Sequence, residues 1–414
     1  MPRKKLGTLC VQDRIYDQGA VNMPIFHSST FAYESLDAAA CAFEGDGSWV
    51  YARVGNPTVF EFEEKMTLLE GGLASVAFGS GMAAIFAVIL STCKPGDAIL
   101  CVDEVYGGTH ELLKTAVADL NIEVKTFSPD LENFPFHEKN VKLIFAETPT
   151  NPSLHVVDIE KLVDVSTGYT DALVCIDNTF ATPINQQPLK LNADITLHSA
   201  TKYINGCGEI IGGVVTVGRW AGTDFLDKLM QKRLCTGGIM GPDTASKCLT
   251  GIKSMAVRMD RHYENAWYVA HLFSAYPEYV KAVRYPGFGG MVSVEFNDRE
   301  TAKAFVDNFD LGTIAVSLGE AKTLVNHPAT MTHSTYSSEE LEEIGLTEGL
   351  VRFSIGLEDK VDLGISMETA FELIKEGGDD RPRECKTLSR DKYPRPEREE
   401  VAGIPYEIRF GSDV

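Results

Sequence analysis

Two hydroxyl residues and a lysine follow a short apolar run in the middle of the chain. The run Ile195 to Leu197 has the character of a β-strand, and Ser199, Thr201 and Lys202 come just past it. Open α/β sheets bind ligands beyond the carboxyl ends of their strands. Hydroxyl groups there can hold phosphate oxygens, and a lysine amine can form a Schiff base with a carbonyl. This layout predicts a pyridoxal phosphate lysine, although a Ser-x-Thr-Lys loop standing alone is more often plain surface.

Two other segments would place a polar group at the end of a strand. Ser80, Gly81 and Met82 lie in a glycine turn between a strand and a helix, where backbone N–H groups can bind an anion. Asp177 ends an apolar run, and a carboxylate there can pair with a pyridinium nitrogen. A simple strand-to-helix turn at 80–82 and a helix-capping aspartate at 177 would give the same sequence patterns. The residues alone therefore leave the structural and the functional interpretation open at both places.

An aromatic residue and two basic ones are weaker candidates. Tyr106 follows another strand and could stack on a planar cofactor and act as an acid, but without other evidence a plain loop tyrosine is the favoured interpretation. Arg352 lies in an apolar strand and would suit bidentate capture of a carboxylate, unless it lies on a solvated face. The hydrophobic periodicity alone indicates no role for Tyr51 or Arg53.

The composition is that of an ordinary soluble globular protein of two or three domains. Of 414 residues, 44% are hydrophobic and 23% charged, with a formal net charge of −21. This acidity disfavours nucleic acid and anionic membranes as partners. The nine cysteines form no CxxC pair, so no metal site is expected. No secretory signal and no apolar run of about 18 residues occurs, which predicts a cytoplasmic protein.

The chain order predicts an α/β enzyme domain followed by a smaller α+β domain. Apolar strands alternating with helices indicate a mostly parallel sheet with helices on both faces. We expect an N-terminal arm over 1–57 that contacts a neighbouring subunit, a large domain over 58–250, a small domain over 251–376 and a polar extension over 377–414. The expected strands are 75–78, 98–102, 141–146, 173–176, 195–197, 291–296, 313–317 and 350–355, and the expected helices are 60–70, 83–90, 109–120, 159–166, 247–276, 300–308 and 365–375.

The order of the motifs resembles the Cys/Met-metabolism group of fold-type I pyridoxal phosphate enzymes. This group includes cystathionine synthases and lyases, methionine γ-lyase and O-acylhomoserine sulfhydrylases. The resemblance runs from about Thr8 to about Lys375. The motifs that carry it are Tyr51-x-Arg53, Ser80-Gly81-Met82, Asp103-Glu-Val-Tyr106-Gly107-Gly108, Glu147-Thr-Pro-Thr-Asn151-Pro152, Asp177-Asn178-Thr179, His198-Ser199-Ala200-Thr201-Lys202-Tyr203, Ser317-Leu318-Gly319, Met331-Thr332-His333 and Arg352-Phe-Ser-Ile-Gly356.

The resemblance implies a role for each candidate residue. Lys202 carries the Schiff base and moves the Cα proton, and Tyr106 stacks on the ring and serves as the acid. Asp177 pairs with the pyridine nitrogen. The phosphate is held by Ser80, Gly81, Met82, Ser199 and Thr201, and by Tyr51 and Arg53 of a neighbouring subunit, with Tyr51 also in the catalytic set. Asn151, Ser317 and Arg352 meet the substrate carboxylate. A homodimer with shared sites, usually paired into a tetramer, follows from this.

Three positions bear on which reaction the site performs. Cystathionine γ-synthases and γ-lyases commonly have acidic residues where this chain has Val50 and Val316, and apolar surface there suits a methylthio or thiol side chain. This favours α,γ-elimination on methionine or homocysteine, giving a thiol, 2-oxobutyrate and ammonia. Bacterial methionine γ-lyases carry a cysteine where this chain has Gly108, so γ-replacement and cystathionine lysis stay open. The short segment 286–290 and the extension 377–414 also depart from the group.

Overall fold

The computed structural model describes residues 4–14, 16, 19–169, 171–333, 336, 341, 345–376 and the backbone of 406–409. The chain divides into two compact units. Unit 1 comprises residues 1–99, 139–144 and 166–256, and unit 2 comprises 100–138, 145–165 and 257–414. The domain boundaries expected from the sequence stay a prediction, and most of the expected extension 377–414 lies outside the described residues.

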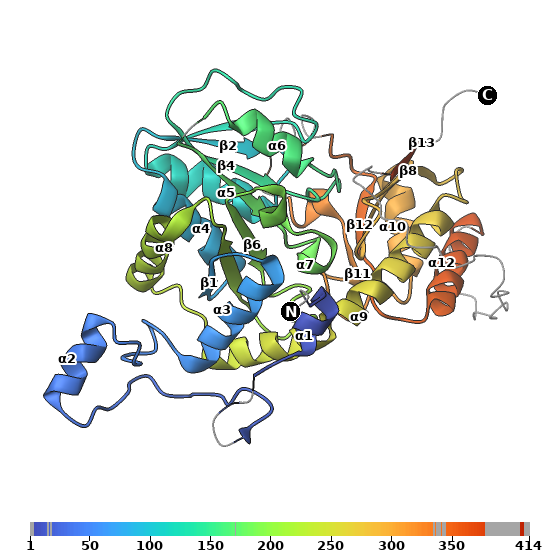
Figure 1. Cartoon of the computed structure of the whole chain (residues 1–414). Coiled ribbons are helices and arrows are strands. Elements are labelled where there is room, and N and C mark those ends of the chain that lie inside the picture. The colour runs from blue at the N-terminus through green and yellow to red at the C-terminus, as the bar shows by residue number, and fades with distance from the viewer. Residues whose placement is uncertain are drawn as a thin grey trace. The chain divides into compact units, whose positions relative to one another are not determined.

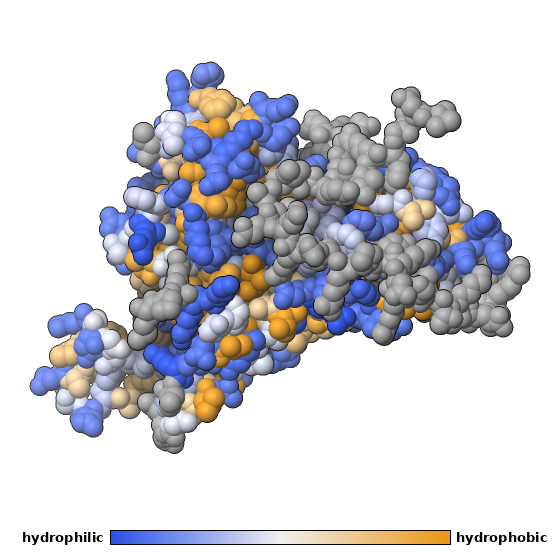
Figure 2. All heavy atoms as spheres, turned by 45° about the vertical axis from the view of Figure 1, so that its right-hand side comes forward, coloured by the Kyte–Doolittle hydropathy of each residue, from blue (hydrophilic) through white to orange (hydrophobic). Residues whose placement is uncertain are grey.

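The N-terminal arm belongs to unit 1 and contains two helices where no sustained periodicity was found. These are α1 (Leu6–Val11) and α2 (Leu36–Glu44). Ser35 caps α2 by accepting the N–H of Ala38, and Gly45, with φ of 95°, ends it. Figure 1 shows α2 standing away from the strands. Its Leu36 and Phe43 are 88% and 76% exposed, and Figure 2 shows apolar residues interspersed with hydrophilic ones on the face that it presents.

The larger sheet has seven strands in the order β1-β7-β6-β5-β4-β2-β3. β5 and β6 are parallel, whereas β7 runs antiparallel to both β1 and β6. The short β3 and β7 were not predicted. The strands are β1 (Ala74–Phe78), β2 (Ala98–Val102), β3 (Glu123–Phe127), β4 (Val141–Glu147), β5 (Leu173–Asp177), β6 (Ile195–Ser199) and β7 (Gly213–Val217).

Two helices of unit 1 position the ends of these strands. α3 (Pro57–Glu70) packs on β1 and β7, and α4 (Gly81–Thr92) packs on β6 and β7. Asn56 caps α3, with a proline at the first helical position, where its missing N–H has no consequence. The other helical segments up to residue 236 are α5 (Gly107–Leu112), η2 (Leu113–Val117), α6 (Ile159–Ser166), α7 (Thr182–Asn185), η3 (Pro188–Leu191) and α8 (Gly222–Thr236).

Unit 2 contains a second sheet, of six strands in the order β10-β11-β12-β9-β8-β13. The predicted strand 313–317 ends early, as β10 (Thr313–Ile314), and β8 (Val280–Tyr285) was not predicted. The remaining elements are β9 (Met291–Phe296), β11 (Leu324–Asn326), β12 (Leu350–Ser354), β13 (Tyr406–Arg409), the helices α10 (Arg299–Asn308) and α12 (Lys360–Lys375), the 3-10 helix η4 (Pro328–Thr330), and α9 (Pro242–Phe273), which both units share.

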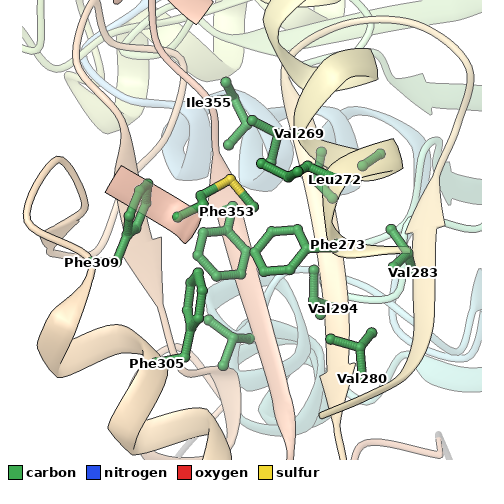
Figure 3. Close-up of a cluster of buried hydrophobic side chains, with 14 of the residues drawn as sticks. Val269, Leu272, Phe273, Val280, Val283, Val294, Phe305, Phe309, Phe353 and Ile355 are labelled. Carbon is green, nitrogen blue, oxygen red and sulfur yellow. The ribbon is translucent and has the colours of Figure 1, made fainter. Parts of the chain in front are cut away.

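An aromatic cluster forms the core of unit 2, and Figure 3 shows the side chains of Phe273, Phe305 and Phe353 converging in it. The ring centroids of Phe273 and Phe353 are 5.0 Å apart. Burying such a side chain stabilises a fold by about 1.5–3 kcal/mol. Because side chains alternate along a strand, fixing Phe353 in the core directs its neighbour Arg352 to the opposite face of β12.

No helix in the described part of the chain combines the length and the apolar character that a membrane span requires. Across the same residues, no group of three or more His, Cys, Asp or Glu side chains is arranged to hold a metal ion.

Candidate active site

The ends of β5 and β6, two strands of unit 1, present Asp177 and Ser199 on one face of the larger sheet. The two strands are parallel and Asp177 pairs with Leu197, so the alternation of side chains puts Asp177, Leu197 and Ser199 on the same side. Ser199 is therefore the last residue of β6, rather than lying past the strand as predicted. Thr179 links the two ends, because its hydroxyl donates to Asp177 Oδ1 at 2.6 Å and accepts the Ser199 N–H at 2.8 Å.

The Asp177 carboxylate can accept a hydrogen bond from one further donor. Burial raises its pKa, while the two hydrogen bonds from Thr179 and the charge of His198 act in the opposite direction. Both bonds from Thr179 go to Oδ1, and among the described residues Oδ2 accepts none. A cationic N–H group at Oδ2 would compensate the buried charge.

The N-terminus of α4 lies against Ser199. A Cβ on Gly81 would come within 2.9 Å of the Ser199 Cβ, and a Cβ on Gly213 would lie 2.2 Å from the carbonyl oxygen of Ser80. The Ser80 hydroxyl accepts the N–H of Ala83 as the helix cap, and the amides of Gly81 and Met82 have no acceptor within the helix. Two amides and a hydroxyl thus form a cradle, open only because glycines line it, that can hold a phosphate.

Thr201 and Lys202 lie in the turn after β6, as predicted. The Thr201 hydroxyl accepts the Gly212 N–H at 3.1 Å. The Lys202 N–H donates to the Ser199 carbonyl at 3.2 Å, and the Lys202 carbonyl accepts the N–H of Gly206 at 2.8 Å. The backbone of Lys202 is therefore fixed on both sides, and the side chain is half-buried.

Tyr51 and Arg53 are exposed on the arm of unit 1. The guanidinium carbon of Arg53 lies 5.6 Å from the centroid of the Tyr51 ring, and Arg53 Nη1 donates to the carbonyl of Leu234 at 3.2 Å. The pair is held together and faces outward.

Unit 2 brings together the three residues expected to meet a substrate carboxylate. Arg352 is only 2% exposed, which excludes the solvated face that the sequence had left open. Its Nη1 donates to Asn151 Oδ1 at 2.8 Å, and its Nη2 donates to the carbonyl of Ser317 at 3.1 Å. Ser317 has a φ of 96°, a strained conformation for a residue other than glycine that often marks a functional site.

A histidine without a predicted role supports this arrangement. His333 Nε2 donates to the Asn151 carbonyl at 3.1 Å. Burial, and then the charge of Arg352, lower the pKa of His333 to about 4, so the ring stays neutral near pH 7. The motif Met331-Thr332-His333 contained this residue, but sequence spacing could not indicate that it reaches Asn151.

Tyr106 stands at the start of α5 in unit 2 and is 43% exposed. Its backbone N–H donates to Glu147 Oε2 at 2.9 Å, and the Tyr336 hydroxyl donates to the Val105 carbonyl at 3.3 Å. The ring lies over Gly108, where a Cβ would come within 2.5 Å of Tyr106 Cε1. The tyrosine loop is thus fixed through its backbone, and the present position of the ring requires glycine at 108.

A family model described as Cys/Met metabolism PLP-dependent enzyme matches residues 7–372. The chain belongs to this family. An L-methionine γ-lyase from Fusobacterium nucleatum is 37% identical over 399 residues, covering 90% of this chain and all of that relative. A cystathionine β-lyase from Coxiella burnetii is 37% identical over 373 residues, covering 85% and 93% of the two chains.

Among solved structures, a putative O-acetylhomoserine (thiol)-lyase from Campylobacter jejuni is similar, with a TM-score of 0.84 and 29% identity. It covers 89% of this chain and 100% of its own, and it contains a pyridoxyl-lysine phosphate adduct. The fold is that of fold-type I enzymes, the cofactor is pyridoxal phosphate, and the chemistry is that of a carbon–sulfur lyase or transsulfuration enzyme. Asp177, whose Oδ2 can accept a hydrogen bond, fits the ring nitrogen of this cofactor. The glycine-lined cradle at Ser199 fits its phosphate.

Proposed function

We propose that this enzyme performs α,γ-elimination on a sulfur amino acid of the methionine or homocysteine type. With methionine and one water, the products are methanethiol, 2-oxobutyrate and ammonia, which balances all atoms. The observation that carries this proposal is the relative named methionine γ-lyase, matched over its full length at 37% identity. Val50 and Val316 give additional support, because neither can pair with the distal ammonium group of cystathionine.

The residues of unit 1 serve the cofactor in this proposal. Pyridoxal phosphate, when bound, supplies the electron sink that makes substrate protons acidic. Asp177 Oδ2 pairs with its ring nitrogen. The phosphate is held by the Gly81 and Met82 amides at the helix capped by Ser80, and by the hydroxyls of Ser199 and Thr201.

Lys202 anchors the cofactor through Nζ and moves the proton at the substrate Cα. The turn that follows β6 fixes its backbone on both sides, so that only the side chain needs to move. A lysine amine positioned beside the reacting atom is one of the groups that transfer protons in enzymes.

The residues of unit 2 serve the substrate. Arg352 binds the carboxylate, with Asn151 and the Ser317 carbonyl holding its guanidinium. An arginine guanidinium that protein groups already orient loses little conformational entropy when it binds a carboxylate. Tyr106 stacks on the cofactor ring and donates a proton to the sulfur that leaves Cγ.

A second copy of the chain completes the site. Tyr51 and Arg53 lie exposed on the arm, as residues that serve a neighbouring subunit's phosphate and catalytic site would. We expect mixed dimers of inactive Arg53→Ala and inactive Lys202→Ala chains to regain part of the activity. Verified mixed dimers that regain none would contradict shared sites.

γ-Replacement is the second candidate function. It is favoured by the similar structure of a putative O-acetylhomoserine (thiol)-lyase and by Gly108, which stands where bacterial methionine γ-lyases carry cysteine. Cystathionine lysis is a further alternative, supported by the relative from Coxiella burnetii.

A substrate panel separates these functions. Methionine, homocysteine, cystathionine and O-acetylhomoserine are supplied singly, with and without an added thiol, and 2-oxo acid and volatile thiol are measured. We expect 2-oxobutyrate from methionine or homocysteine without any thiol acceptor. Products only from O-acetylhomoserine plus thiol would favour γ-replacement, and a preference for cystathionine would favour the cystathionine lyase.

A further inference from the structure

Glu70 is a fully buried carboxylate to which neither the sequence nor the proposed chemistry gives a role. It is the last residue of α3 and has no exposed surface. A carboxylate is disfavoured at the C-terminal end of a helix, where the dipole is negative, and burial of a charge adds a further cost. These two costs must be offset by the contacts that the carboxylate makes.

Glu70 binds the ends of both strands that carry the cofactor residues. Its Oε1 lies 2.5 Å from His198 Nε2 and accepts the Asn178 Nδ2 hydrogen bond at 3.3 Å. Asn178 directly follows Asp177 at the end of β5, and His198 directly precedes Ser199 at the end of β6. Both contacts converge on the same oxygen.

The alternation of side chains separates these residues onto the two faces of the sheet. Asp177 and Ser199 point to the face on which α4 packs, and Asn178 and His198 point to the face on which α3 packs. Thr179 joins the strand ends on the first face, and Glu70 joins them on the second. The separation between the ring-nitrogen carboxylate and the phosphate hydroxyl is therefore fixed from both sides.

We propose that Glu70 is a positioning residue for pyridoxal phosphate, because it ties the strand end of Asp177 to the strand end of Ser199 and holds His198. The inference rests on the proposed roles of Asp177 and Ser199.

The chain supplies a matched control on the same helix. Glu61 is also buried, and its carboxylate accepts the Tyr16 hydroxyl at 2.8 Å and pairs with Arg14 at 2.6 Å. Glu70→Gln and Glu61→Gln therefore make the same change to buried carboxylates of one helix, of which only the first touches the strand ends of the site.

The test compares cofactor binding with stability in the two variants. Apoprotein is titrated with pyridoxal phosphate by visible absorption, and its unfolding midpoint is measured without cofactor. Loss of a residue that orients a ligand-binding group lowers affinity by about 10- to 100-fold at metal sites. We expect Glu70→Gln to weaken pyridoxal phosphate binding by about 10-fold and to shift the absorption band, and Glu61→Gln to do neither.

Unchanged affinity and an unchanged band in Glu70→Gln, with a fall in apoprotein stability like that of Glu61→Gln, would overturn the proposal. If Glu70→Gln does not fold, His198→Ala tests the same link, with the same expected loss and the same contradicting result. Asp177→Ala separates the proposed function from this inference. Normal cofactor binding in Asp177→Ala would contradict the role of Asp177 itself, whereas a loss there with normal Glu70→Gln would contradict only the role of Glu70.

Discussion

The cofactor residues of unit 1 and the substrate residues of unit 2 are held by different kinds of contact. Asp177 and Ser199 stand at the ends of paired strands, and Gly81 at the start of a helix, so the backbone sets their positions. Arg352 is held instead by the side chain of Asn151 and by the carbonyl of Ser317. Asn151 depends in turn on His333.

This difference suggests that the two sets of residues serve separate functions, one in binding the cofactor and the other in selecting the substrate. Apart from the side chains of Thr179 and Glu70, which tie the strand ends together, the unit 1 site is built from strand ends and helix amides, which suits a cofactor that every member of the family shares. A network of side chains with a strained serine can change its substrate through a few substitutions. Substitutions in the two regions should therefore affect different measured quantities.

The largest effect is expected for Lys202→Ala, which removes the amine used in both regions of the proposed site. We expect a loss of activity of more than about 10⁴-fold, with an unchanged fold because the residue lies in a turn. Release of 2-oxo acid and the unfolding midpoint check both parts, with the exposed Lys228→Ala as control. A variant with full activity would refute the assignment of this lysine.

Arg352→Lys tests the substrate side of the comparison. A lysine cannot form the bidentate contact, so KM for the amino acid should rise by about 10²-fold, while affinity for pyridoxal phosphate stays unchanged. Ser199→Ala should do the reverse, with about 10-fold weaker cofactor binding and little change in KM at saturating cofactor. If either variant altered KM and cofactor affinity equally, the proposed separation of cofactor-binding and substrate-binding residues would be wrong.

Val316→Glu tests the interpretation of specificity. Val316 is 58% exposed, so a carboxylate is tolerated there and can pair with the distal ammonium of cystathionine. We expect the ratio of kcat/KM for cystathionine to that for methionine to rise by about 10-fold. The exposed Val257→Glu is the control, and an equal change in that variant would exclude a specific role for position 316.

A further prediction concerns stability and pH at His333 rather than activity. Its pKa is about 4 in the folded chain, below the ordinary value of 6.5, so between these values only the unfolded chain binds the proton. Folding stability should therefore fall as pH decreases from about 6.5 to 4, by up to ~1.4 kcal/mol per pH unit from this group. His333→Gln should remove that slope in denaturant unfolding, and the exposed His137→Gln should retain it. An identical slope in wild type and His333→Gln would contradict the neutral ring.

The sequence predicted the elements whose pattern is local. The apolar runs that became β2, β4 and β5 were correctly placed, as was the turn that carries Lys202, because strands that are buried along most of their length are nearly continuous apolar segments. β7 was missed because its short run stands between glycine-rich and polar segments. β3 was missed because three of its five residues are polar and only its last residue is buried.

The long-range contacts of the site could not be predicted. Nothing in the spacing of His333 and Asn151, or of Glu70 and His198, indicates that they meet, because each pair is joined only by the packing of distant segments. The buried state of Arg352 likewise depends on Phe353 in the aromatic core. The residues that can carry the chemistry could be identified from the sequence, whereas the residues that hold them in place could be identified only from the structure.

The most direct test of the proposed function supplies methionine alone to the enzyme loaded with pyridoxal phosphate. Methanethiol, 2-oxobutyrate and ammonia are quantified over time without any added thiol. The proposal predicts all three in equal amounts, with none from the Lys202→Ala protein. Absence of 2-oxobutyrate from both methionine and homocysteine, with thioether formed from O-acetylhomoserine and a thiol, would contradict it.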